Sequence, residues 1–238
     1  MFFECGNAKV AICLHSRTLT TSRTRRVITA NLFIDWDSAS RVSTIKPQKN
    51  MPLALRLSCT RQAYTELQER IISKLAEIEP KSPIKILKTR IYHGWHSGTT
   101  PSPDKIVWDQ LRTQLKAISR NKISYLPDIE FGNELICRGA RSPIYDTLRA
   151  DRSNPGVSSQ KMVDTALVSD LLSFCRSESS SFRRNERPTT LAIVVGDDDD
   201  LLPGVFVAEA WGLPTYVFRV TRAHDNKHLS TDGIIHRI

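Results

Sequence analysis

The chain has 238 residues, of which 40% are hydrophobic and 25% charged, and this length and composition are ordinary for a globular protein with a sizeable buried core. No stretch approaches the roughly 20 apolar residues that cross a bilayer, so we expect no integral membrane protein. The 34 Lys and Arg outnumber the 25 Asp and Glu, which gives a net charge of +9. This excess favours a polyanionic partner, with nucleic acid as the first candidate.

The N-terminal segment differs from the rest of the chain. Residues 1–29 contain most of the stretch "SRTLTTSRTRRVITA" (residues 16–30), which is rich in Ser, Thr and Arg and free of acidic residues. A transit peptide is one interpretation. An extension made of a strand and a polar loop, or a start codon placed too early, is the alternative that we favour. We therefore expect an extension over residues 1–29 and one domain over residues 30–238.

Strand-like and helix-like patterns alternate along the first half of that domain. Residues 30–36, "ANLFIDW", form a short apolar run that ends in an acid. From Thr60 to Pro80, apolar residues recur at spacings of three and four, which predicts an amphipathic helix that ends at the proline. Residues 84–93 have the pattern of a second strand, and residues 104–119 that of a second helix.

The second half of the domain continues this alternation. Its expected elements are a strand at 133–140, a basic loop at 141–161, a helix at 162–175, a polar connector at 176–190, a strand at 191–195, a helix at 204–212, a strand at 213–220 and an edge strand or last turn within 229–238. Strands that alternate with helices predict a mainly parallel central sheet covered on both faces. The expected fold is therefore a three-layer α/β domain.

Acidic residues follow two of the predicted strands. Asp35 ends the first strand, and the strand "LAIVV" runs through Gly196 into four consecutive aspartates, 197–200. Such a tract needs open solvent or a cation, because neighbouring carboxylates repel each other. Asp164 lies near the start of the helix at 162–175, where the helix dipole favours a carboxylate. If the two strands are neighbours, these acids meet at one edge of the sheet and predict a site for Mg²⁺ or Mn²⁺.

Three sequence blocks resemble the signature of NYN-domain proteins, a branch of the PIN-like nucleases. They are "LFIDWDSAS", "QKMVDTALVSDLL" and "VVGDDDDLLPGVFVAEAWGLPTYVF", in that order along the chain. The resemblance spans roughly residues 30–220 and implies a Rossmann-like PIN fold and metal-dependent ribonuclease activity. It also implies an acidic site that holds Mg²⁺ or Mn²⁺.

The resemblance assigns the site residue by residue. The first family aspartate falls on Asp35 and the helix aspartate on Asp164. Counting back from Pro203 places the paired loop acids at Asp198 and Asp200, whereas counting forward from Gly196 places them one residue earlier, at 197 and 199. We prefer the first register because the helix that follows then has the family's length, and we keep Asp37 and Asp199 as outer-shell candidates.

The sequence departs from the family pattern at three places. Ser38 replaces a common Asn, which bears on the positioning of water or phosphate, Met162 replaces a usual Gly, and the acidic loop carries more charge than the pattern. These changes leave the fold assignment intact but bear on full activity.

Basic and aromatic residues outside the acids are candidates for contacts with single-stranded RNA. The predicted RNA-binding residues are Lys161, Arg183, Arg184 and Ser38. In "IYHGWHSG", Trp95 could stack on a base, while His93 and His96 could ligate a metal, although a loop of packed aromatic side chains explains the same pattern.

The cysteines bear on the compartment. They are odd in number and contain no Cys-x-x-Cys pair, so neither a disulfide framework nor a zinc ribbon fits and we expect a cytoplasmic location. The five cysteines are Cys5, Cys13, Cys59, Cys137 and Cys175.

The sequence thus predicts a metal-dependent ribonuclease that hydrolyses phosphodiester bonds through Asp35, Asp164, Asp198 and Asp200. The alternative is a catalytically silent scaffold of the same fold that binds RNA or a protein partner. A phosphatase is disfavoured because no Asp-x-Asp-x-[Thr/Val] motif follows the first strand. The oligomeric state stays open, and a homo-oligomer is compatible with the sequence.

Overall fold

The computed structural model describes the chain except for residues 1–25, 46–50, 138–139, 151–157, 180–188 and 221–232. The expected N-terminal strand and polar loop therefore lie outside the described residues for most of their length. The first described strand begins at Ile28.

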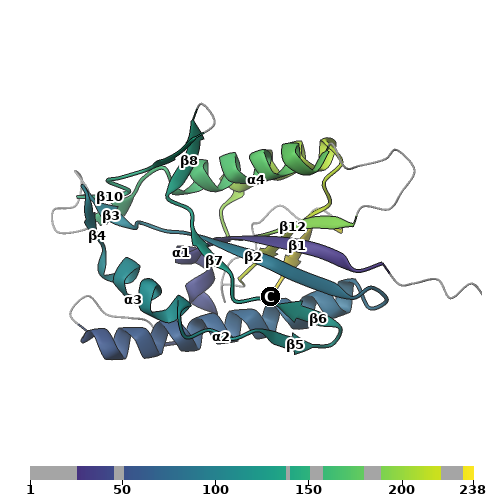
Figure 1. Ribbon diagram of the computed structural model, residues 1–238, viewed down its shortest axis with the longest axis horizontal. Helices are drawn as coiled ribbons and strands as arrows, with labels where there is room; N and C mark the ends of the chain where they lie inside the picture. The colour runs from purple at the N-terminus through teal and green to yellow at the C-terminus, as the bar shows by residue number, and fades with distance from the viewer. Residues whose placement is uncertain (1–25, 46–50, 138–139, 151–157, 180–188, 221–232) are drawn as a thin grey trace, which may run out of the picture.

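A central sheet of eight strands organises the described residues (Figure 1). The strand order is β14 (Ile235–Arg237), β13 (Thr215–Arg219), β12 (Thr190–Val195), β1 (Ile28–Asp35), β2 (Ile84–Tyr92), β6 (Ile123–Tyr125) and β5 (Ile118–Arg120), and β7 (Ile129–Phe131) also pairs with β2. Every pairing is parallel except that of β5 with β6. The mainly parallel α/β sheet predicted from the sequence is confirmed.

Helices cover both faces of this sheet (Figure 1). Helices α2 (Leu53–Ile78) and α3 (Pro103–Arg112) pack on one face, and α4 (Val163–Ser179) and α5 (Leu202–Ala210) pack on the other. The central strand shows why both faces are apolar: Leu32 and Ile34 belong to the first core and Phe33 to the second. Side chains alternate between faces in a strand, so a continuous apolar run fits a strand buried on both sides.

The expected second helix is shorter than predicted. Helix α3 begins at Ser102, whose Oγ accepts a hydrogen bond from the Lys105 backbone N–H at 3.2 Å, and it ends at Arg112 rather than at residue 119. Residues 118–120 instead form β5, which pairs with β6 through a turn in which Asn121 and Lys122 have positive φ angles. The prediction failed because Leu115 and Ile118 continue the apolar spacing of the helix. In the structure the chain leaves the helix after Arg112, and Ile118 pairs with Tyr125 in the sheet. Helix α2, by contrast, begins seven residues earlier than Thr60, directly after Pro52.

The predicted strand at 133–140 forms, but not in the central sheet. Strand β8 (Glu134–Cys137) pairs antiparallel with β9 (Ala140–Pro143) as a separate hairpin. The strands that pair with β2 besides β1 are β6 and β7, each too short to show a periodic pattern. The expected basic loop also contains a small hairpin, β10 (Leu148–Ala150) with β11 (Ser158–Gln160), and β3 (His96–Ser97) pairs with β4 (Thr100–Pro101).

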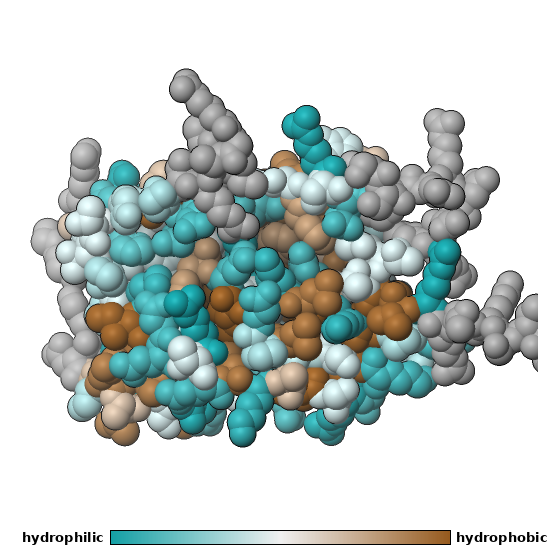
Figure 2. All heavy atoms as spheres, in the orientation of Figure 1, coloured by the Kyte–Doolittle hydropathy of each residue, from teal (hydrophilic) through white to brown (hydrophobic). Residues whose placement is uncertain are grey.

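The remaining expectations concern the chain end and the surface. The final segment adds β14 as a parallel edge strand. None of the described helices combines the length and apolarity needed to cross a bilayer. On the face shown in Figure 2, apolar side chains form separate patches among polar ones, as is usual for a protein surface.

Candidate functional site

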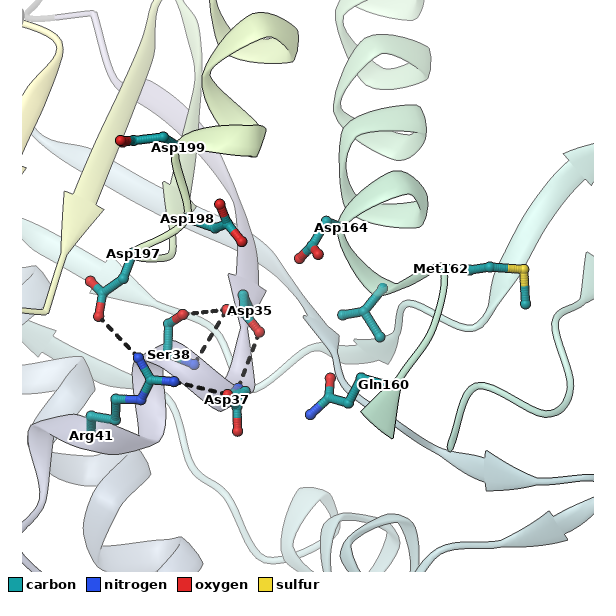
Figure 3. Close-up of a pocket in the computed structure, with 11 residues that line it drawn as sticks. Asp35, Asp37, Ser38, Arg41, Gln160, Met162, Asp164, Asp197, Asp198 and Asp199 are labelled. Carbon is teal, nitrogen blue, oxygen red and sulfur yellow. Dashed lines mark hydrogen bonds and ion pairs between the residues drawn. The ribbon is translucent and has the colours of Figure 1, made fainter. Parts of the chain in front are cut away.

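The topology brings the predicted acids to one edge of the sheet. Strands β1 and β12 are parallel neighbours in which Ile34 pairs with Val195, so Asp35 and the aspartate tract leave the sheet side by side. The condition on which the sequence interpretation depended, that these two strands are neighbours, is therefore met. Asp164 is the second residue of α4, and its helix starts at the same edge (Figure 3).

A pocket of about 600 Å³ lies where these segments meet. Its lining residues are Asp35, Asp37, Ser38, Arg41, Gln160, Met162, Val163, Asp164, Asp197, Asp198 and Asp199. Six of these eleven side chains are carboxylates and one is a cation, so the pocket carries a strong negative charge in a chain that is basic overall.

Asp35 forms the floor of this pocket and is only 6% exposed. Its Oδ1 accepts the backbone N–H of Asp37 at 3.1 Å, and its Oδ2 accepts both the backbone N–H and the hydroxyl of Ser38. Burial raises the pKa of Asp35, although the hydrogen bond from Ser38 opposes the rise. Since each oxygen offers two acceptor positions, Oδ1 keeps one for a ligand.

Asp164 faces Asp35 and Asp198 across the pocket (Figure 3). The pKa of Asp164 rises from 3.8 to about 6, mainly because of partial burial and then because of the negative charges of Asp35, Asp198 and Asp200. The start of α4 therefore does not keep this carboxyl acidic. Like charges from separate segments oppose its ionisation in the absence of a cation.

The aspartate tract divides between two directions. Asp197 is 7% exposed, and its carboxylate accepts the backbone N–H of Val220 at 2.9 Å and lies 3.6 Å from the Arg41 guanidinium. Asp199 forms an ion pair with Arg219, whose side chain is 4% exposed. Arginines of the protein itself thus neutralise two of the four negative charges. The sequence interpretation had assigned this neutralisation to a bound metal ion.

Asp198 is the member of the tract that points toward Asp164 (Figure 3). It is exposed, and its Oδ1 accepts the backbone N–H of Asp200 at 3.0 Å, which starts a short 3₁₀ turn over 199–201. Asp200 is not among the lining residues, although its charge is close enough to affect Asp164. The structure therefore places Asp198 in the pocket, leaves Asp200 out of its lining, and pairs both residues of the alternative register with arginines.

Two backbone features shape the pocket. At Gly196, between β12 and the tract, an added Cβ would lie 2.7 Å from Leu201 Cδ1 and 3.5 Å from Asp35 Cβ, so glycine leaves room for the buried Leu201 side chain beneath the tract. Met162, directly before α4, has φ +64°. Glycine adopts this left-handed conformation most readily, which gives a physical reason for the glycine that the sequence comparison expected there.

The structure separates the predicted RNA-binding residues. Ser38 is buried and its hydroxyl donates to Asp35, whereas Lys161 is exposed beside the pocket and its backbone N–H donates to Thr147. Arg183 and Arg184 lie outside the described residues. Lys161 is therefore the one predicted cation whose position beside the pocket is described.

Trp95 cannot stack on a base as it stands. Its side chain is completely buried, packs against Phe131 and donates from Nε1 to the Ile91 carbonyl at 3.2 Å. His93 contacts Gln160 and Asp104 instead of sharing a metal with His96. The alternative of a packed aromatic loop is the correct one.

Sequence reasoning missed two pocket residues, Arg41 and Gln160. Arg41 follows Asp35 by six residues and pairs with both Asp37 and Asp197. Gln160 ends β11, a three-residue strand inside the expected loop. Arg41 lies just after the first signature block, and Gln160 is the first residue of the second block but carries no assigned role there.

The carboxylates of the pocket are the right chemical type to bind a divalent cation, but their positions in this structure do not surround one point. Carboxylate oxygens suit Mg²⁺ and Mn²⁺. Among the described residues, however, no group of three or more His, Cys, Asp or Glu side chains has the arrangement to hold a metal ion as it stands. Binding through three carboxylates therefore requires the exposed Asp164 and Asp198 side chains to turn toward Asp35, which is a change between staggered rotamers.

Comparison with protein-family models, with curated proteins and with solved structures finds no match for this chain.

Proposed function

We propose that this chain is a metal-dependent ribonuclease of the PIN-like, NYN-domain type. The observation that carries the proposal is the convergence of Asp35, Asp164 and Asp198, from three separate segments, on one pocket in which the pKa of Asp164 rises to about 6. Mutually repelling carboxylates cost stability unless a cation joins them, so their presence at the carboxyl edge of a parallel sheet indicates a binding role. The three sequence blocks that resemble NYN-domain proteins support the same function.

In this proposal, Asp35, Asp164 and Asp198 hold Mg²⁺ or Mn²⁺. When bound, such an ion supplies charge neutralisation and Lewis-acid activation for phosphodiester hydrolysis. Ser38 fixes the Asp35 carboxylate by donating from its backbone and its hydroxyl to Oδ2. Without a cation the pKa of Asp164 is about 6, and a bound cation would lower it, so that Asp164 would hold the ion as an ionised carboxylate.

The basic surface supplies the attraction for RNA. The net charge of +9 draws in a polyanion, and the acidic pocket becomes tolerable to a phosphodiester once a cation occupies it. Lys161, exposed next to the pocket, is a proposed backbone-phosphate contact. Arg183 and Arg184 keep the same proposed role from the sequence.

One observation favours the second candidate, a silent scaffold that binds RNA or a protein partner. The carboxylates do not meet around one point as they stand, and Asp197 and Asp199 are already paired with arginines. Such pairing is sufficient to stabilise the tract without any metal.

Cleavage of labelled single-stranded RNA by purified protein distinguishes the two candidates. We expect cleavage with Mn²⁺ or Mg²⁺, loss of cleavage in EDTA, and a loss of about 100-fold or more in Asp198→Asn. Asp200→Asn should lose less, because Asp200 does not line the pocket. Asp128→Asn, an exposed carboxylate elsewhere, is the matched control. RNA that binds but stays intact with either ion would support the scaffold.

A further inference from the structure

Gln160 is an uncharged polar side chain in the acidic pocket that the proposed chemistry does not use. It is the last residue of β11, opposite Leu148 of β10. In Figure 3, its amide oxygen lies on the side that faces Asp164, and its amide nitrogen lies on the other side.

A chain of hydrogen bonds behind the pocket fixes this orientation. Gln160 Nε2 lies 2.9 Å from His93 Nδ1, and His93 Nε2 lies 3.3 Å from Asp104 Oδ2. Asp104 Oδ1 in turn accepts from Arg56 NH1 at 3.0 Å. Burial acts to raise the pKa of Asp104, but the hydrogen bond from His93 and the nearby Arg56 guanidinium outweigh it and hold that pKa below its usual value.

The donor and acceptor roles follow from the two contacts of His93. The Gln160 NH₂ only donates, so His93 Nδ1 accepts its hydrogen bond. The imidazole proton is then on Nε2, which donates to the Asp104 carboxylate. The Gln160 carbonyl oxygen is therefore left toward the pocket as a hydrogen-bond acceptor.

Packing also holds the side chain in place. An added Cβ at Gly94 would lie 3.3 Å from Gln160 Cγ and 2.9 Å from Leu148 Cδ1, so the backbone at Gly94 packs closely against both side chains. The adjacent Lys161 backbone N–H donates to the Thr147 carbonyl at 2.9 Å. The acceptor thus has a fixed position beside the carboxylates.

A fixed neutral acceptor next to a bound phosphodiester needs a donor on the substrate. Phosphate and sugar ring oxygens of a nucleic-acid backbone only accept, and the ribose 2′-hydroxyl is the one backbone group that donates. We propose that the Gln160 amide oxygen accepts a hydrogen bond from the 2′-hydroxyl of a nucleotide beside the bound phosphodiester, and so favours RNA over DNA. This inference rests on the proposed function, because it takes the pocket to hold a nucleic-acid backbone.

Binding rather than cleavage tests the inference separately from the nuclease activity. Fluorescence anisotropy with Ca²⁺ compares short single-stranded RNA and DNA of one sequence, with deoxyuridine in place of thymidine. Gln160→Met keeps the shape of the side chain and removes the acceptor. It should weaken RNA binding about three- to tenfold and leave DNA binding unchanged, since one neutral hydrogen bond is lost. His93→Phe should lower the RNA preference in the same direction, and Gln110→Met, at an exposed position on α3, should not.

Each outcome decides one of the two claims. An RNA-to-DNA affinity ratio that is equal in the wild type and in Gln160→Met overturns the role of Gln160, even if the wild type cleaves RNA. A ratio that collapses in Gln160→Met upholds the sugar contact, even if no RNA is cleaved with Mn²⁺, and the nuclease is then refuted alone. No measurable binding to either oligonucleotide overturns both.

Discussion

Replacing Asp164 with asparagine should stabilise the protein in the absence of divalent cations. Asp164 faces Asp35 and Asp198 across the pocket, and partial burial together with these negative charges raises its pKa from 3.8 to about 6. Asparagine has nearly the same shape and no charge, so Asp164→Asn removes the repulsion and keeps the packing.

The pKa sets both the size and the pH range of the effect. A rise from 3.8 to about 6 corresponds to about 3 kcal/mol, at about 1.4 kcal/mol for each pH unit. Because Asp164 is exposed at the pocket mouth, solvent screening reduces this to about 1 kcal/mol. Below pH 3.8 the carboxyl is protonated in both states and costs nothing. As pH rises to about 6 the unfolded chain ionises first, so wild-type stability falls and the advantage of the variant grows.

Denaturant unfolding in EDTA at pH 4, 5, 6 and 7 measures this difference. The free energy of unfolding of Asp164→Asn should exceed that of the wild type by about 1 kcal/mol at pH 7, and by little at pH 4. Asp128→Asn, the exposed control, should show no such trend. A variant that is equally or less stable than the wild type at pH 7, or an advantage that does not change with pH, would refute the electrostatic reasoning.

Three further substitutions test the structure around the pocket. Asp199→Asn should lower the free energy of unfolding by about 2 kcal/mol in thermal or urea melts, because it leaves the buried Arg219 guanidinium without its charge partner. An unchanged melting temperature would show that this ion pair does not stabilise the protein. Met162→Gly should raise the free energy of unfolding by about 0.5 to 1 kcal/mol, because glycine adopts the left-handed φ of +64° without strain. Met162→Ala should give no gain, and equal effects of the two substitutions would contradict that cause. Gly196→Ala should cost about 1 to 3 kcal/mol, since its Cβ would lie 2.7 Å from Leu201 Cδ1, and a neutral result in the same melts would show that the tract has room to move.

The parts of the fold that the sequence predicted are those with long periodic or apolar runs. Strands β1 and β12 are buried on both faces, so their apolar runs identified them and the acids that follow them. Short strands carried no such signal. Strands β6 and β7 have three residues each, and the helical spacing that extends past Arg112 concealed β5.

The candidate site was predictable only in its acids. Asp35 and Asp198 follow apolar runs that predict strands, and Asp164 lies near the start of a predicted helix, so the sequence was sufficient to select these three acids. The pairing of Asp197 with Arg41 and of Asp199 with Arg219 depends on side-chain direction over a few residues, which no spacing encodes. Gln160 reaches the pocket through the pairing of β10 with β11. These two strands have three residues each and are separated in the sequence by residues 151–157, so no pattern in the sequence predicts their pairing.

Titration of the purified protein with Mn²⁺, followed by calorimetry, tests most directly whether three separate segments form one cation site. The wild type should bind Mn²⁺ saturably, and Asp35→Asn, Asp164→Asn and Asp198→Asn should each weaken the affinity about tenfold or more, whereas Asp128→Asn should leave it unchanged. Wild-type protein that shows no saturable binding, or binding that all three substitutions leave intact, would contradict the assignment of this pocket as the metal centre of a ribonuclease.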